Sequence, residues 1–163
     1  HSWTSTNRHE SVAEHSWRLS LMAYFIQDEF PEADINKVIL MCIFHDLGEA
    51  ITGDIPAFNK TKKDEEIEDK EITQLINTLP EGYREKLSHL FKEMNELQTL
   101  EARIYKALDK METLVQHNEA DISTWLPLEY KLNLEYGEEA VSFSSYMKEL
   151  RNEICNDSLK KME

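Results

Sequence analysis

The sequence predicts an all-α fold, a compact helical bundle that forms a single domain over residues 1–163. Only four Gly and four Pro interrupt its 163 residues, so long stretches lack the residues that disfavour helices most strongly. Apolar residues recur at the helical period of 3.6 in several stretches, and no alternating run of β-branched residues is long enough for a strand. One domain is expected because domains commonly contain about 100–200 residues.

The first helix is expected from Ser11 to about Asp28. Ser11 can cap it because Glu14, three residues later, completes a capping box, and the loop around Pro31 ends it. One side of this helix carries apolar residues that can face a core: Val12, Leu19, Met22, Ala23 and Ile26.

The second helix is expected to begin after Asp34, whose carboxylate can cap it, and to end near Phe44. Residues 38–44 are apolar on nearly every side, which is typical of a helix buried inside a bundle. His45 and Asp46 stand at its C-terminal end, and turns are expected at Gly48 and at residues 53–56.

Further helices are expected at residues 64–79, 82–95 and 98–118, and a last one from about Glu138 to the C-terminus. The acidic run that opens the 64–79 helix suits the positive end of a helix dipole. The 98–118 helix carries a core stripe of apolar residues: Leu97, Leu100, Ile104, Leu108, Met111 and Val115.

The charge balance excludes two classes of partner. The chain has 18 Lys and Arg against 32 Asp and Glu, a formal net charge of −14. Polymeric nucleic acid and anionic membrane surfaces are both bound through a surplus of basic side chains. No stretch approaches a membrane span of about 20 apolar residues. No signal-peptide pattern opens the chain, and its two cysteines form no disulfide framework, so a cytoplasmic protein is expected.

The segment from His45 to Glu49 is the most informative for chemistry. A His-Asp pair at the end of an apolar helix is costly to bury unless it is paired or bound to a metal. Imidazole and carboxylate are both ligands of divalent first-row metals. Glu49 follows His45 by four residues, so the two share a face if the helical turn continues. Taken alone, the His-Asp pair is more simply a polar helix end satisfied by hydrogen bonds.

Two further polar positions lie on other helices. His15 follows Glu14 in the first turn of the first helix, and Asp109 lies beside the core stripe of the 98–118 helix. Each alone is more simply a solvent-exposed side chain, and periodicity does not single out Asp109. Their order along the chain is what connects them: His15, then His45-Asp46, then Asp109.

This order resembles that of the HD-domain metal-dependent phosphohydrolases. The segment Lys106-Ala107-Leu108-Asp109-Lys110 is similar to the last ligand motif of their 5′-deoxynucleotidase-type branch, and the motifs together extend over roughly two-thirds of the chain. Two longer strings are similar to that branch: Arg8-x-Glu10-Ser11-Val12-Ala13-Glu14-His15-Ser16 and His45-Asp46-Leu47-Gly48-Glu49-Ala50-x-Thr52-Gly53-Asp54-Ile55-Pro56.

The resemblance implies an HD-type bundle in which one divalent cation lies between three helices. The ion could be Mn, Co, Mg, Fe or Zn, because all of them tolerate mixed His and carboxylate ligands. The resemblance assigns four ligands: His15, His45, Asp46 and Asp109. It also gives Glu49 the role of orienting or deprotonating the attacking water, or of acting as general acid.

The substrate contacts are expected from the resemblance and from side-chain chemistry. By the resemblance, Asp54 would meet the sugar hydroxyl and help select deoxyribose. A guanidinium can grip phosphate bidentately, which makes Arg8 a candidate phosphate clamp, and Lys60 is a second candidate to face the phosphate. Trp3 would stack on the base or sugar, although it follows Ser2 and not the Arg that precedes this Trp in the branch. From the residues alone, Asp54 is equally a turn residue, and Arg8 and Lys60 are equally solvated side chains.

The expected activity is metal-dependent hydrolysis of a small nucleotide phosphomonoester, above all of a deoxynucleoside 5′-monophosphate. Two alternatives stay open: a nucleotide-sensing or partner-binding module with little turnover, and an HD hydrolase of another small phosphate ester. Di-metal HD enzymes need extra histidines, and the remaining ones form no second His-Asp motif. The motifs Glu-x-x-His, His-Glu-x-x-His and Gly-x-Ser-x-Gly of other enzyme classes are absent. A homodimer is compatible with the resemblance and with the apolar last helix.

Overall fold

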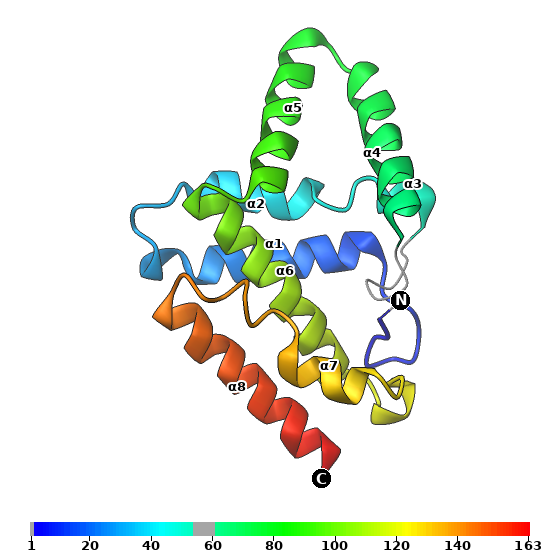
Figure 1. Cartoon of the computed structure of the whole chain (residues 1–163), viewed down its shortest axis with the longest axis vertical. Helices are drawn as coiled ribbons and strands as arrows, with labels where there is room; N and C mark the ends of the chain where they lie inside the picture. The colour runs from blue at the N-terminus through cyan, green and yellow to red at the C-terminus, as the bar shows by residue number, and fades with distance from the viewer. Residues whose placement is uncertain (1, 54–60) are drawn as a thin grey trace.

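The computed structural model describes residues 2–53 and 61–163, and its elements there are helical, as predicted (Figure 1). The only extended pairing among these residues is an isolated bridge between Trp3 and His9. Short 3-10 turns occur at Gln27–Glu29 and Ile122–Thr124. The α-helices are α1 (Val12–Phe25), α2 (Ile35–Phe44), α3 (Glu49–Thr52), α4 (Lys62–Asn77), α5 (Glu81–Glu96), α6 (Leu100–Glu119), α7 (Glu129–Glu135) and α8 (Ser145–Met162).

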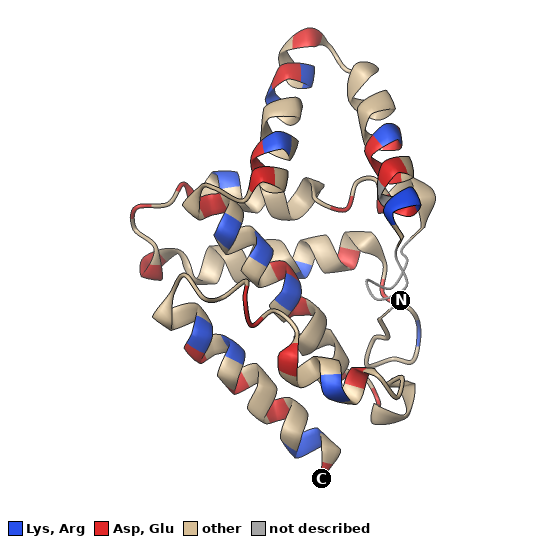
Figure 2. Cartoon of the chain, viewed as in Figure 1, with Lys and Arg blue, Asp and Glu red and all other residues tan. Residues whose placement is uncertain are grey.

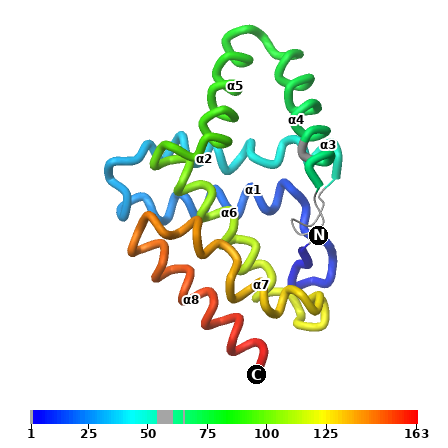
Figure 3. The backbone as a smooth tube through the Cα atoms, viewed as in Figure 1, coloured from blue at the N-terminus to red at the C-terminus, as the bar shows by residue number. Residues whose placement is uncertain are grey.

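The helix α6 is central to the bundle. It packs against α1, α2, α5 and α8, while α1 and α2 lie side by side and run in opposite directions (Figure 1). The tube in Figure 3 shows α4 and α5 as a hairpin that projects beyond the α1–α2 pair. This hairpin contacts the rest of the molecule through α3, α2 and α6. Within the part of the chain that the structure describes, none of these helices has the length and apolar character needed to cross a membrane.

The core lies where α6 meets α1, α2 and α8. Ile104, Leu108 and Met111 of the predicted stripe are fully buried there. Burying an apolar side chain of this size contributes about 1.5–3 kcal/mol. The stripe does not begin at Leu97, which is 37% exposed and ends α5 in a left-handed backbone conformation. Side chains from the neighbouring helices complete the core: Leu19, Val38, Met41 and Met147.

Polar caps set where the helices begin. The predicted capping box of Ser11 and Glu14 opens α1, and Asp34 accepts a hydrogen bond from a backbone N–H at the start of α2. A second capping box, formed by Thr61 and Asp64, opens α4. This helix therefore begins at Lys62, two residues before the predicted start.

The prediction that α2 is buried on all sides was wrong. Val38, Met41 and Cys42 are completely buried, but Leu40 is 45% and Ile43 46% exposed. The reason is that α2 packs against α1, α5 and α6, and these neighbours leave one side of it open.

The predicted start of the last helix at Glu138 was also wrong. Gly137 adopts a positive φ of 79°, and residues 138–143 form turns. The helix α8 begins only at Ser145, because the Ser144 side chain accepts a hydrogen bond from the N–H of Met147 and so caps it.

A glycine allows a close approach between α3 and α4. A Cβ atom at Gly48 would lie 3.1 Å from two side-chain atoms of Ile72, closer than ordinary van der Waals contact. The absent side chain thus lets the turn after α2 pack directly on α4.

Candidate metal centre

Three helices bring the predicted ligands together. His15 lies in the first turn of α1, His45 caps the end of α2 and is followed by Asp46, and Asp109 lies in the middle of α6. Because α1, α2 and α6 pack on one another, residues that are distant in the sequence meet inside the bundle.

The donor atoms of His15, His45 and Asp46 lie within 4.8 Å of one another. The two imidazole Nε2 atoms are 3.2 Å apart, and Asp46 Oδ2 lies 3.1 Å from Nε2 of His45 and 3.7 Å from that of His15. Around a cation with bonds of about 2.1 Å, neighbouring ligands are about 3.0 Å apart in an octahedron and about 3.4 Å in a tetrahedron. The observed separations therefore fit a divalent metal ion.

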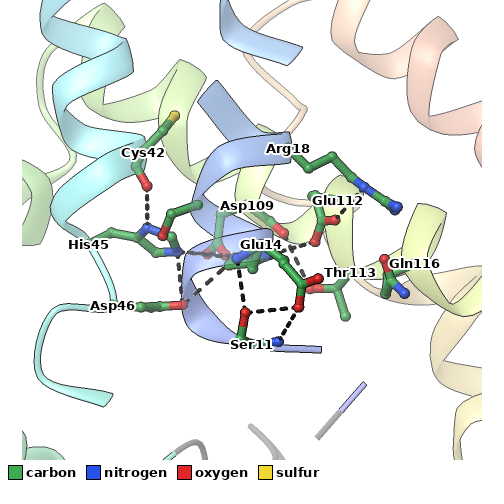
Figure 4. A network of polar contacts seen from close by, with 12 residues as sticks. Ser11, Glu14, Arg18, Cys42, His45, Asp46, Asp109, Glu112, Thr113 and Gln116 are labelled. Atoms are coloured by element: carbon green, nitrogen blue, oxygen red, sulfur yellow. Dashed lines mark hydrogen bonds and ion pairs between the residues drawn. The ribbon is translucent and has the colours of Figure 1, made fainter. Parts of the chain in front are cut away.

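Asp109 approaches the same imidazoles from α6. Its Oδ1 lies 3.4 Å from Nε2 of His15 and 3.5 Å from Nε2 of His45. Its Oδ2 accepts a hydrogen bond of 2.8 Å from Nζ of Lys106. Figure 4 shows Asp46, His45 and Asp109 directed toward one another. The carboxylate of Asp109 is thus shared between the imidazole pair and an ammonium group.

Both imidazoles are held through their other nitrogen. His45 Nδ1 donates to the backbone carbonyl of Cys42 at 2.9 Å, and His15 Nδ1 donates to Oε2 of the fully buried Glu112 at 2.5 Å. In neutral imidazoles these bonds leave the Nε2 lone pairs facing each other. Two lone pairs at 3.2 Å repel unless positive charge lies beside them, so the arrangement calls for a cation or for protons.

The neighbouring carboxylates also favour positive charge at the two imidazoles. Burial lowers the pKa of His15, but the bonds to Asp109 and Glu112 outweigh burial and raise that pKa to about 11. Burial also lowers the pKa of His45, and Asp109 and Asp46 raise it to about 9. Burial raises the pKa of Asp109, yet Lys106 and both imidazoles hold it well below its usual range. The carboxylates thus favour positive charge at the imidazoles, which is the charge that a bound cation would supply.

Glu112 is a residue that the sequence reasoning missed. Its contact with His15 spans 97 positions in the sequence, and its other carboxylate oxygen lies 3.4 Å from Nε of Arg18. A carboxylate that accepts from a ligand histidine fixes its tautomer and orientation. The available signal was an acid four residues after Leu108, on the buried side of α6.

A cavity of about 770 Å³ opens beside the centre, and His45, Asp46 and Glu49 line it. Glu49 begins α3, and the backbone between it and His45 forms turns and no continuous helix; both side chains still line this cavity. Tyr105 and Lys106 of α6 line it as well. The hairpin of α4 and α5 supplies the opposite wall: Glu68, Asp69, Ile72, Thr73, Ile76, Asn77, Ser88, Phe91, Met94 and Asn95.

Two of the predicted substrate contacts have partners elsewhere in the chain. The guanidinium of Arg8 binds both carboxylate oxygens of Glu14, and the Trp3 ring centroid lies 4.1 Å from that of His9. Neither Arg8 nor Trp3 is among the described residues that line the cavity. Asp54 and Lys60 lie outside the described residues.

Comparison with known proteins identifies the family. A family model described as HD domain matches residues 1–151. A human protein named 5′-deoxynucleotidase HDDC2 is 36% identical over 119 residues, which are 72% of this chain and 57% of the human protein. A Dictyostelium discoideum protein of the same name is 32% identical over 115 residues, 66% of this chain and 60% of that protein. The chain thus spans little more than half the length of these curated relatives.

Solved structures are similar to nearly the whole chain. One from Magnetospirillum magnetotacticum MS-1, described as a predicted metal-dependent phosphohydrolase, has a TM-score of 0.80 and 26% identity, covering 98% of this chain and 83% of that one. One from Pyrococcus furiosus, described as a conserved hypothetical protein, has a TM-score of 0.69 and 31% identity, covering 90% of this chain and 84% of that one. With the family model matching nearly its full length, the chain belongs to the HD domain family.

Proposed function

We propose that the protein is a metal-dependent phosphohydrolase that releases phosphate from a deoxynucleoside 5′-monophosphate. The observation that carries the proposal is the meeting of two imidazoles and two carboxylates beside a cavity that Glu49 also lines. The names of the curated relatives support the substrate class.

In this proposal His15, His45, Asp46 and Asp109 hold one divalent cation. Such an ion, when bound, lowers the pKa of a water molecule and neutralises charge on a phosphoryl oxygen. Glu112 and the Cys42 carbonyl keep both Nε2 atoms aimed at the centre. The donor set suits Mn, Co, Mg, Fe and Zn alike.

Glu49 would act on the attacking water. Phosphoryl transfer depends on in-line placement and charge stabilisation more than on covalent help from the protein. A carboxylate on the cavity wall can orient the water and accept its proton as the bond to phosphorus forms. The 5′-oxygen leaves from the opposite side of phosphorus as the ester bond breaks and takes a proton from solvent, which leaves nucleoside and phosphate.

The substrate contacts remain part of the proposal. Asp54 would meet the sugar hydroxyl and select deoxyribose, by the resemblance to the 5′-deoxynucleotidase-type branch, and Lys60 would face the phosphate. Arg8 would have to leave Glu14 to grip the phosphate, and Trp3 would have to leave the His9 ring to stack on the nucleotide.

The test is phosphate release from a panel of nucleotides by protein loaded separately with Mn²⁺, Co²⁺ or Mg²⁺. We expect release from deoxynucleoside 5′-monophosphates with at least one metal.

Glu49→Ala should keep the metal and lose most turnover, whereas Glu66→Ala, which changes an exposed residue of α4, should keep both the metal and the turnover. If the metal-loaded protein releases phosphate from no monophosphate, the proposal that it is a phosphohydrolase is wrong. Nucleotide binding without release would instead favour a sensing module, and release from other esters alone would change the substrate class.

The extent of the domain, the location of the protein and its oligomeric state are proposed on separate grounds. We propose a single HD-type domain over residues 1–163, supported by the family match to residues 1–151, and a cytoplasmic protein, supported by its two free cysteines.

A homodimer draws more support from α1 than from α8, because Trp17, Tyr24 and Phe25 on α1 are 68%, 53% and 77% exposed. Light scattering of the wild type and of Phe25→Glu tests it, and a monomeric wild type contradicts it.

A further inference from the structure

Lys106 lies beside the metal centre and lines the same cavity as His45 and Asp46. Its Nζ donates to Oδ2 of Asp109 at 2.8 Å, while Oδ1 of the same carboxylate lies 3.4 Å from Nε2 of His15. The Lys106 side chain is 35% exposed and lines the cavity of about 770 Å³ together with Glu49. The carboxylate of Asp109 therefore lies between the Lys106 ammonium and the two imidazoles. The side chains of Lys106 and His45 both line this cavity.

The charges around that space are unbalanced. Among the described residues of the cavity wall, Lys106 is the only Lys or Arg, whereas four are acids: Asp46, Glu49, Glu68 and Asp69. A phosphate monoester carries about −1.5 to −2 charge at pH 7, so most of this wall repels it. Arg8, the candidate phosphate clamp expected from the sequence, is bound to Glu14.

We propose that Lys106 binds the phosphate group of the substrate, an inference that rests on the proposed phosphohydrolase function. An ammonium offers three N–H donors, and the bond to Asp109 uses one of them. The two oxygens of Asp109 face the imidazoles and the ammonium, and two oxygens of a phosphate can face the same groups from the cavity side. A divalent cation at the centre would neutralise the negative charge of Asp109, so the positive charge of Lys106 would be available to the phosphate.

The neighbouring lysine of α6 offers a matched control. Arg103, Lys106 and Lys110 occupy successive turns of α6, where basic residues follow one another along the helix (Figure 2). Nζ of Lys110 lies 4.3 Å from the centroid of the Tyr136 ring. Its side chain lines a second cavity of about 690 Å³, which Lys106 also borders, but not the cavity beside the centre. Lys110→Gln thus removes the same charge from the same helix without touching the wall beside the centre.

The experiment measures binding of inorganic phosphate and of a deoxynucleoside to the Mn²⁺-loaded protein by calorimetry, with bound metal and helicity recorded for each variant. A hydrogen bond to a charged group corresponds to a loss of about 10-fold to 100-fold when it is removed. We expect that loss for phosphate in Lys106→Gln and Lys106→Met, near wild-type deoxynucleoside binding, and full metal content. Lys106→Arg and Lys110→Gln should bind phosphate within a few fold of the wild type.

Unchanged phosphate affinity in a folded, metal-loaded Lys106→Gln or Lys106→Met would overturn the inference. So would loss of bound metal in both neutral variants, because Lys106 would then act only by holding Asp109. Inorganic phosphate binds without being hydrolysed, so these outcomes are distinct from a wild type that releases no phosphate from nucleotides, which overturns the proposed function itself.

Discussion

Single residues decide the geometry of the centre, and Glu112 shows how. A fully buried carboxylate is costly unless it is paired, and here it pairs with the imidazole of His15 and lies near Arg18. Its place in the core is therefore tied to the orientation of a ligand. His15, His45, Asp46 and Asp109 could be predicted from the order of motifs in the sequence, and the structure brings them together. The contacts of Glu112 and Lys106 could not be predicted, because they depend on how α6 packs against α1 and on which residues form the cavity wall; the position of Glu112 four residues after Leu108 indicated only that it is buried.

Substitution of Glu112 should weaken metal binding. Glu112→Gln keeps an acceptor for Nδ1 of His15 but removes the negative charge, and loss of such an outer partner typically costs about 10-fold to 100-fold in metal affinity. Titration of the metal-free protein with Mn²⁺ measures this. Glu119→Gln, which changes the exposed acid bound to Arg18, serves as the control and should bind metal as the wild type does. Equal affinities in the two variants would contradict the role of Glu112.

Asp109→Ala should remove bound metal while leaving the helices intact. Asp109 contributes the contact from α6 to both imidazoles, whereas α6 itself is held by its buried stripe. Metal content by atomic absorption, with helicity from circular dichroism, checks the prediction. Full metal occupancy in this variant would show that three ligands suffice and that Asp109 is not the fourth.

At the scale of the elements, caps explain both the successes and the failures of prediction. The Ser11 and Asp34 caps were visible in the sequence, and α1 and α2 begin where they indicate. The apolar residues Val141 and Phe143 precede α8, and the predicted last helix included them although they lie in turns. Apolar spacing reports which side chains face the core, but it does not report whether the backbone between them is helical.

Removing the cap of α8 should lower the stability of the whole domain. Ser144→Ala removes the acceptor for the N–H of Met147, and loss of such a cap typically costs about 1 kcal/mol. Urea unfolding followed by circular dichroism measures the free energy of unfolding. The adjacent Ser145 is exposed and lies inside the helix, so Ser145→Ala should have little effect. A cost as large in Ser145→Ala would mean that the cap is not the cause.

At the scale of the whole molecule, the all-α class and the bundle could be predicted because few residues interrupt the helices. The placement of the α4–α5 hairpin could not be predicted, because its contacts with α3, α2 and α6 depend on the tertiary structure. The centre itself joins α1 and α2 to α6, which lies far from both along the chain. A ligand that binds only the folded chain stabilises it in proportion to the logarithm of its concentration.

Metal should therefore raise the melting temperature. At a free concentration 100 times its dissociation constant, the gain is about 2.7 kcal/mol, or about 5–10 °C for a domain of this size. Thermal melts in the presence of EDTA and of excess Mn²⁺ measure the shift. Asp109→Ala should melt at the same temperature in both, and a wild type that shows no shift would contradict a metal site shared by three helices.

The glycine at position 48 has a consequence for what can enter the site. Its missing side chain lets the turn after α2 touch Ile72, and both residues line the cavity of about 770 Å³. The contact is so close that a single methyl group there would force the Ile72 side chain to shift by a few tenths of an ångström. Gly48 thus keeps the turn that carries His45, Asp46 and Glu49 in contact with the hairpin, so that the two walls of the cavity lie close together.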